Sequence, residues 1–223
     1  MGEQVEAEAR MMTPALARFQ RASCALAILV GAVVLAGWEL DIAALKSVAP
    51  GLPAMMSNTA VAFVFAGFSL WLMLADAPAA WNRTGRWVDV PARACASVVL
   101  AVGLLTLSEY LFGWDLGIDQ LLLREAPGPG PVSFPGRPSP QTALAFLLVG
   151  VALLLLRVEM SSGCRPARLF AGAALVVALL ALIGYGYHAI PLYAITPHTG
   201  MAVHTAVTLG MLSAAILSAY PDR

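Results

Sequence analysis

Charged residues are scarce in this chain of 223 residues. They make up 12% of the sequence, whereas a soluble domain carries about 25%. Hydrophobic residues account for 60%, and the mean hydropathy is +0.79. Because so few charged groups cannot cover a globular surface in water, the sequence predicts an all-α integral membrane protein whose main partner is the lipid bilayer.

An excess of basic charge is also absent, since 13 Lys and Arg balance 13 Asp and Glu. Nucleic-acid binding needs a basic stripe, so no nucleic-acid partner is expected. The three cysteines, Cys24, Cys95 and Cys164, are expected near or beyond the cytoplasmic ends of helices, where they stay reduced and pack as small apolar residues. No Gly-x-Ser-x-Gly, His-Glu-x-x-His or phosphate-loop motif occurs, so no enzymatic activity is predicted.

Apolar runs long enough to cross, or nearly cross, a bilayer occur six times. Only Glu109 and His204 bring an ionisable group into them. A spanning helix needs about 20 residues, and the fourth run is short, so Arg157 is expected to extend it by snorkelling. The sequence therefore predicts six transmembrane helices, over Ala22–Trp38, Asn58–Ala75, Ala94–Phe112, Pro140–Leu156, Leu169–Tyr187 and Met201–Tyr220.

The distribution of basic residues predicts the orientation. Ten of the 13 Lys and Arg lie before the first run, between the second and third, between the fourth and fifth, or after the sixth. Only Lys46, Arg124 and Arg137 lie on the other side. By the positive-inside rule, both termini are expected in the cytoplasm, with residues 1–20 as a cytoplasmic segment and residues 21–223 as the membrane domain. Residues 1–20 lack a signal-peptide pattern, so the first segment is expected to be retained, in the bacterial inner membrane.

One short pattern opens the second, fourth and sixth runs. A threonine is followed by Ala at +1, a bulky apolar residue at +4 and a small residue at +8, and the +4 and +8 positions fall on the same helical face as the threonine. Such a repeat predicts three copies of one helical hairpin, at about 21–75, 94–157 and 168–220. Small residues let membrane helices approach closely, so a helix-packing role is expected for Thr59, Gly67, Thr142, Gly150, Thr205 and Ser213.

A polar residue precedes each repeated threonine, namely Asn58, Gln141 and His204. One interpretation is helix capping, which Ser57 and Asn58, and Ser139 before Pro140, fit well. Alternatively, three hairpins packed around a pseudo-threefold axis would bring the three helix starts together near the outer face. Because helix N-termini carry partial positive charge, the resulting basin could hold a small polar or anionic ligand.

The outward turns also repeat, because Gly37–Ile42 matches Gly113–Ile118 and, more loosely, Gly186–Ile190. This match aligns Trp38, Trp114 and Tyr187. Aromatic rings are common at the membrane boundary for structural reasons alone.

Glu109 lies one turn inside the outer end of the third run. An ionisable group in a membrane segment is a candidate functional residue. The alternative is that it reaches the interface or bonds to a neighbouring residue.

Three histidines, His188, His198 and His204, lie on or near the outer side. A haem or metal site between them stays open as an alternative. Only His204 is clearly in a predicted helix, so no cofactor and no metal are predicted.

Leu107–Asp119, Pro138–Phe146 and Met201–Ala206 together resemble the membrane-associated-sensor-type N-terminal transmembrane module of bacterial sensor histidine kinases and diguanylate cyclases. The resemblance implies a non-catalytic signal-input module of a two-component or related system, with a cytoplasmic kinase or cyclase effector as partner. The chain departs from this pattern because it reaches Arg223 without kinase or cyclase motifs. The candidate sensing layer comprises Glu109, Trp38, Trp114, Tyr187, Asn58, Gln141 and His204.

Two alternatives and the oligomeric state stay open. An accessory subunit of a larger membrane complex would present a partner face that includes Trp71 and Met73. A small-solute transporter is disfavoured because three same-direction repeats differ from the inverted halves of many transporters. A homodimer is also left open.

Overall fold

In a computed structural model, residues 2–49, 51–75, 85–120, 136–160, 163–193 and 200–219 are described. Every regular element in them is a helix, which confirms the all-α prediction for this part of the chain. The long helices are α1 (Gly2–Glu39), α3 (Ser57–Ala75), α4 (Gly85–Phe112), α5 (Pro140–Leu154), α6 (Pro166–Gly186) and α8 (Val203–Ser218), joined by the short α2 (Ala43–Lys46) and α7 (Ile190–Tyr193). Helix α1 runs without a break across residue 20, so the expected N-terminal segment and the first apolar run form one helix.

Four helical segments are long and apolar enough to span a membrane: Pro14–Glu39, Ser57–Ala75, Val88–Phe112 and Pro166–Gly186. Helices α5 and α8 are apolar but have only 15 and 16 residues. At about 1.5 Å per residue each falls short of a hydrocarbon core about 30 Å thick. These two helices are short because Ser139 and Ala202, which precede them, have extended backbone, so the chain before each helix is extended rather than helical.

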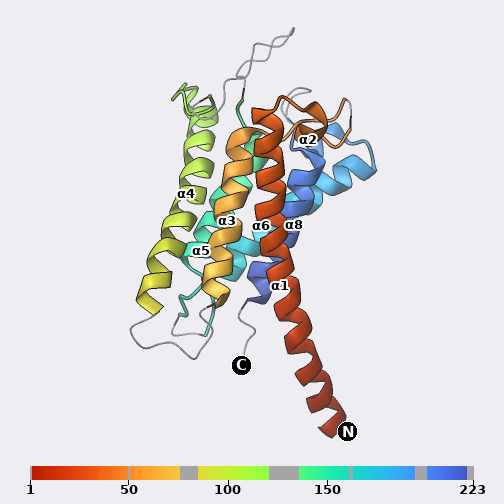
Figure 1. Cartoon of the computed structure of the whole chain (residues 1–223), viewed down its shortest axis with the longest axis vertical. Coiled ribbons are helices and arrows are strands. Elements are labelled where there is room, and N and C mark those ends of the chain that lie inside the picture. The colour runs from red at the N-terminus through yellow and green to blue at the C-terminus, as the bar shows by residue number, and fades with distance from the viewer. Residues whose placement is uncertain are drawn as a thin grey trace.

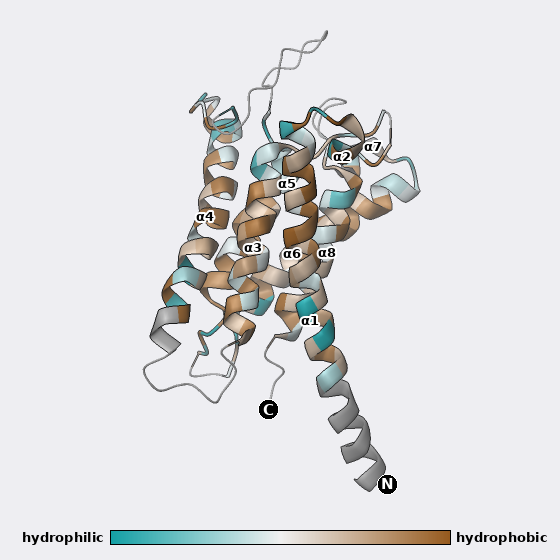
Figure 2. Cartoon of the chain, viewed as in Figure 1, coloured by the Kyte–Doolittle hydropathy of each residue, from teal (hydrophilic) through white to brown (hydrophobic). Residues whose placement is uncertain are grey.

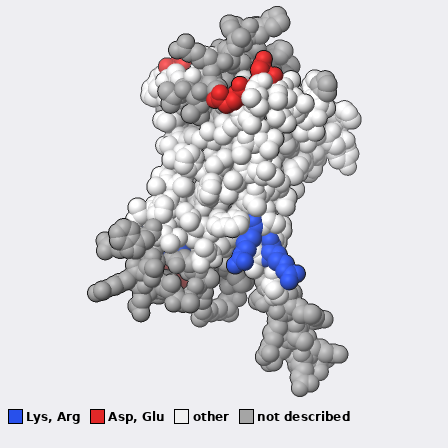
Figure 3. All heavy atoms as spheres, in the orientation of Figure 1, with Lys and Arg blue, Asp and Glu red and all other residues white. Residues whose placement is uncertain are grey.

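Hydropathy and charge are arranged as a membrane protein requires. Figure 2 shows apolar residues along the middle of the long helices and polar ones towards both ends. On the face drawn in Figure 3, the visible acidic groups gather near one end, the basic groups lie towards the other, and an uncharged belt separates them. The N-terminal end of α1 and the C-terminal end of α8 lie at the same end of the bundle (Figure 1).

The six long helices form an inner triangle and an outer ring. Helices α3, α5 and α8 contact one another at the centre, and each packs extensively against the helix before it, giving the pairs α1–α3, α4–α5 and α6–α8. The contacts α3–α4, α5–α6 and α8–α1 then close the ring. This cyclic order gives the bundle a pseudo-threefold axis, around which the three hairpins repeat. The long helices run roughly along the length of the bundle (Figure 1).

Glycines bring the two helices of a hairpin into backbone contact. A Cβ added at Gly67 would lie 2.8 Å from the Cys24 carbonyl oxygen, and one at Gly150 would lie 2.6 Å from the Leu100 nitrogen. These two glycines therefore do pack helices. Ser213, at the same position of the third repeat, is fully buried on α8.

Two further contact glycines lie on the outer helices, where no repeat motif marked them. A Cβ on Gly31 would lie 2.5 Å from the Ala60 carbonyl oxygen, and one on Gly103 would lie 2.3 Å from the Leu147 nitrogen. No residue larger than glycine fits at either place without moving a backbone.

Polar contacts join the hairpins at the end opposite α2. Arg157 forms an ion pair with Asp89 and donates to the Met73 carbonyl oxygen at 3.2 Å, so it ties α5 to α3 and α4 rather than only snorkelling. Gln20 donates from Nε2 to the Ser218 carbonyl oxygen at 2.7 Å and thereby ties α1 to α8.

Of the two residues expected to be exposed on a partner face of an accessory subunit, only Trp71 is exposed. Trp71 is 42% exposed, but Met73 is 3% exposed and belongs to the core. Its position two residues further along α3 turns it towards the bundle interior.

Candidate functional site

A cavity of about 70 Å³ lies where the three inner helices begin, and the three repeated threonines line it together. Thr59, Thr142 and Thr205 each occupy the third position of their helix, α3, α5 and α8 respectively. They are nearly inaccessible from outside, with exposures of 1–3%. Equivalent residues of three hairpins meet at one point only on the symmetry axis, so the cavity lies on the pseudo-threefold axis.

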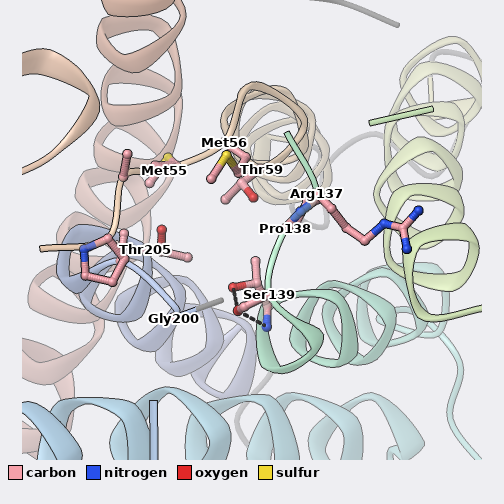
Figure 4. A pocket seen from close by; sticks show the side chains of 12 residues that line it. Met55, Met56, Thr59, Arg137, Pro138, Ser139, Gly200 and Thr205 are labelled. Atoms are coloured by element: carbon pink, nitrogen blue, oxygen red, sulfur yellow. Dashed lines mark hydrogen bonds between the residues drawn. The ribbon is translucent and has the colours of Figure 1, made fainter. Parts of the chain in front are cut away.

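The cavity wall repeats in the same way. Three residues before the threonines stand Met56, Ser139 and Ala202, and five residues before them stand Ala54, Arg137 and Gly200, and all six line the cavity. Figure 4 shows the extended segments that carry these residues arriving from different sides. Each hairpin therefore contributes one wall.

Bulky side chains lie one turn deeper along the axis. Phe63, Phe146 and Leu209 follow the threonines by four residues and are fully buried. The rings of Phe63 and Phe146 meet edge to face, with their centroids 5.0 Å apart. This layer forms the floor under the cavity.

An aromatic residue on each outer helix holds the chain segment that lines the cavity. Trp38 donates from Nε1 to the Met55 carbonyl oxygen at 2.9 Å. The Tyr110 hydroxyl donates to the Pro138 carbonyl oxygen at 3.0 Å, and the Tyr185 hydroxyl donates to the Met201 carbonyl oxygen at 2.5 Å. All three acceptors lie four residues before the repeated threonine, so the three bonds are equivalent.

The structure thus equates Trp38 with Tyr110 and Tyr185, and not with Trp114 and Tyr187. Trp114 is 53% exposed and stacks on Phe112, and Tyr187 is 82% exposed. Neither of these two rings approaches the cavity wall through a hydrogen bond of this kind.

A sequence signal for the correct alignment does exist. Each hydrogen-bonding aromatic follows the small contact residue of its outer helix by seven positions: Gly31 before Trp38, Gly103 before Tyr110 and Ala178 before Tyr185. Seven residues are about two helical turns, so both side chains face the inner helix.

The polar residues before the threonines do not line the cavity. Asn58 donates from Nδ2 to the Ile118 carbonyl oxygen at 3.0 Å, in the turn that follows α4. The Gln141 carbonyl oxygen Oε1 and both ring nitrogens of His204 are buried without a hydrogen-bond partner in the described part of the chain. Adjacent residues on a helix point about 100° apart, so when the threonine faces the axis its neighbour faces the next hairpin.

The structure confirms the capping expected of Ser139 at the start of α5. Its Oγ accepts the Thr142 backbone N–H at 3.2 Å. Helix α8 has no side-chain hydrogen bond at its N-cap, Ala202.

Beside the cavity lies an acidic cluster formed by Glu109, Asp115 and Asp119, with Arg137 among them. The Arg137 Nε donates to Asp119 Oδ2 at 2.6 Å and lies 3.4 Å from Glu109 Oε2. Its Nη2 donates to the Trp114 carbonyl oxygen at 3.4 Å and lies 4.0 Å from Asp115 Oδ1. Glu109 is 1% exposed and its Oε1 accepts the Leu116 backbone N–H at 2.9 Å, which agrees with the alternative that it bonds to neighbouring residues.

The electrostatics of the cluster are dominated by burial. Burial raises the pKa of Asp119, although the hydrogen bond and charge of Arg137 act in the opposite direction. Oxygen atoms of the three acidic residues lie within 4.8 Å of one another, a spacing that could hold a metal ion. The Arg137 guanidinium already supplies a cation between them, so these residues are better suited to an internal ion pair than to a metal.

The histidines do not assemble a metal site in the described residues, because the only group with suitable spacing there contains none of them. His188 lies in the turn after α6 with a positive φ of 54°. His198 lies outside the described residues.

Comparison with protein family models, with curated proteins and with solved structures found no match to this chain.

Proposed function

We propose that this chain is a non-catalytic sensory input module of a bacterial signal-transduction protein, embedded in the inner membrane. In this proposal six helices cross the bilayer and both termini lie in the cytoplasm, so the cavity faces the outside. The observation that carries the proposal is the cavity on the pseudo-threefold axis, which all three hairpins line.

A ligand in this cavity is well placed to shift the packing of the three hairpins. It contacts three packed bodies at once, so its binding free energy depends on how the hairpins are placed relative to one another. A ligand shifts a conformational equilibrium only by its difference in affinity for the two states, and a site shared by three hairpins supplies that difference directly.

The size and chemistry of the cavity restrict the ligand. A volume of about 70 Å³ accommodates only a few non-hydrogen atoms. The lining offers threonine hydroxyls, and three helix N-termini with partial positive charge begin there. Small polar or anionic molecules are therefore the class we propose.

Transmission to an effector would use the far ends of the helices. The bond from Gln20 to Ser218 ties the end of α8 to α1. A change in hairpin packing at the cavity would therefore move the C-terminal end of α8 together with α1, whose N-terminal half continues towards a cytoplasmic kinase or cyclase partner.

The test uses the chain in lipid nanodiscs and measures thermal unfolding with formate, acetate, nitrate, acetamide and ethanol. At least one solute should raise the midpoint of wild type. Ala202→Leu, which fills the cavity with a larger side chain, should abolish the shift, and Thr205→Val should reduce it. Ala173→Leu, on the exposed face of α6, is the matched control and should respond like wild type. A shift that is equal in all four proteins would refute binding in the cavity.

The transporter alternative requires a path through the bundle. The layer of Phe63, Phe146 and Leu209 fills the axis below the cavity, which disfavours it. Solute flux into liposomes that Glu109→Gln abolishes would favour transport instead.

The accessory-subunit alternative draws on two large exposed side chains of α3, Phe68 at 46% and Trp71 at 42%. Lipid can cover such residues as well as a partner can. A stoichiometric partner that co-purifies from native membranes, and is lost with Phe68→Ala and Trp71→Ala, would support this alternative.

A further inference from the structure

Among the residues that the structure describes, the acidic cluster holds one more buried carboxyl group than basic group. The side chains of Glu109, Asp119 and Arg137 are 0%, 6% and 1% exposed, so all three are withdrawn from water. Asp115 is 71% exposed at its side chain and is solvated. Two buried carboxylates therefore share one guanidinium, and an uncompensated buried charge is costly unless the group takes up a proton.

The hydrogen bonds show where that proton belongs. Glu109 Oε1 accepts the Leu116 N–H and Asp119 Oδ2 accepts from Arg137. The remaining oxygens, Glu109 Oε2 and Asp119 Oδ1, are buried and have no hydrogen-bond partner among the described residues. A proton on either carboxyl group provides the donor that this pair of buried acceptors lacks.

No other titratable group of the described ranges supplies a positive charge to this cluster. From α4, the Tyr110 ring lies under the Arg137 guanidinium at 5.4 Å, and its hydroxyl is committed to the Pro138 carbonyl oxygen. Helices α3 and α5 carry no charged residue, and Asn58 of α3 contributes only a neutral amide to the Ile118 carbonyl oxygen of the turn after α4.

The cluster is connected to the cavity through Arg137. This residue lines the cavity, while Figure 4 shows its side chain directed away from it, towards α4. The neighbouring Gly136 packs so closely on the Asp119 backbone that an added Cβ would lie 2.6 Å from its carbonyl oxygen. The wall formed by residues 136–139 is thus anchored on the residues that would hold the proton.

We propose that Glu109 and Asp119 hold one proton between them beside Arg137, forming a proton-binding site that sets the position of one cavity wall. With one proton the buried trio is neutral and the wall is held. Loss of that proton leaves two carboxylates in contact, and gain of a second removes the charge partner of Arg137, so either change loosens the wall. The proton-binding site is argued from the acidic cluster alone, whereas its use in signalling rests on the proposed function.

The first test is difference infrared spectroscopy of the whole chain in nanodiscs near neutral pH. We expect the carbonyl stretch of a protonated carboxyl group, sensitive to deuterium exchange. Asp115→Asn should keep this band, because its side chain is solvated, whereas Glu109→Gln should remove it. A wild-type spectrum without the band, or an unchanged band in Glu109→Gln, overturns the proposal.

The second test measures unfolding against pH in detergent. A carboxyl pair that keeps its proton in the folded state binds more protons than the unfolded chain above about pH 4, so stability falls as pH rises until the folded pair deprotonates. The equilibrium constant should change by up to tenfold per pH unit in wild type and Asp115→Asn, and by clearly less in Glu109→Gln. Equal slopes in all three overturn the proposal even where Asp119→Asn fails to fold.

The two proposals can fail separately. If the infrared band is present but no solute shifts the unfolding midpoint, the proton site stands and the cavity-ligand function fails. If solutes bind but the band is missing, the reverse holds.

Discussion

Replacing Gly103 by alanine tests the close contact on which the second hairpin depends. The added Cβ would lie 2.3 Å from the Leu147 nitrogen and 2.8 Å from the Ala143 carbonyl oxygen. Both are backbone atoms of α5, so no side-chain rotation relieves the overlap. Ordinary contact begins near 3.4 Å, so the two helices must separate by about 1 Å.

The expected cost follows from two opposing terms. Overpacking a tight interface costs roughly 1–3 kcal/mol. Alanine recovers up to about 1 kcal/mol of helix propensity over glycine. Because the overlap is with backbone atoms, we take the upper end of the overpacking range, about 3 kcal/mol, and expect a net loss of about 2 kcal/mol in the free energy of unfolding, which is roughly thirtyfold in the equilibrium constant.

The assay is reversible unfolding by SDS in mixed micelles, followed by circular dichroism. Gly172→Ala is the matched control, because a Cβ at that position of α6 has no neighbour within 4 Å. Gly210→Ala provides an intermediate case, since its nearest contact would be an ordinary one at 3.7 Å. Gly172→Ala and Gly210→Ala should be as stable as wild type or more stable by up to about 1 kcal/mol, because they gain helix propensity without overlap, and Gly103→Ala should lie well below wild type. If Gly103→Ala is as stable as Gly172→Ala, the close approach of α4 and α5 is wrong.

Three other variants test contacts at the two ends of the bundle. Tyr185→Phe removes the hydroxyl that anchors the segment before α8 and should cost about 1 kcal/mol, whereas Tyr187→Phe, at an 82% exposed residue, should cost nothing in the same SDS titration. Ser139→Ala removes the N-cap of α5, so we expect a loss of about 1 kcal/mol and faster hydrogen exchange of the Thr142 amide. Gln20→Ala should speed exchange only around residue 20 in the middle of α1 and at the C-terminal end of α8, and protection that stays unchanged there would contradict the tie between them.

The repeat of Thr, Ala, bulky and small residues carried more structural information than any single residue. It located the starts of α3, α5 and α8 within one or two positions and put Phe63, Phe146 and Leu209 on the face of the threonines. Helical periodicity suffices for this, because the spacing of four residues returns a side chain to the same face. The same periodicity also shows why the residue before each threonine turns away from the axis. Asn58, Gln141 and His204 could therefore have been excluded from the cavity by the geometry of the helix alone.

The equivalent residues of the outer turns were harder to predict, because the local sequence match disagrees with the positions that these residues take on their helices. Gly37–Ile42 and Gly113–Ile118 match in sequence, yet it is Tyr110 that makes the hydrogen bond equivalent to that of Trp38. Hydrogen bonding depends on where a side chain lies relative to the inner helix, which the contacts of Gly31 and Gly103 determine. In the third hairpin the outer helix carries the larger contact residue, Ala178, and the inner helix carries the glycine, Gly210. The hydrogen-bonding aromatic residue still follows the contact residue of its outer helix by seven positions.

Arg137 is the residue that sequence reasoning had least chance of finding. It counted only as one of three basic residues on the outer side, and 28 positions separate it from Glu109. In the predicted orientation, Arg137 is an exception to the positive-inside rule, and Glu109 is an ionisable group within a predicted membrane segment. The structure places the two side chains together, since the Arg137 Nε lies 3.4 Å from Glu109 Oε2 and 2.6 Å from Asp119 Oδ2. Exceptions to two independent rules at the same end of a bundle are thus themselves a signal, and in this chain they lead to the wall of the cavity.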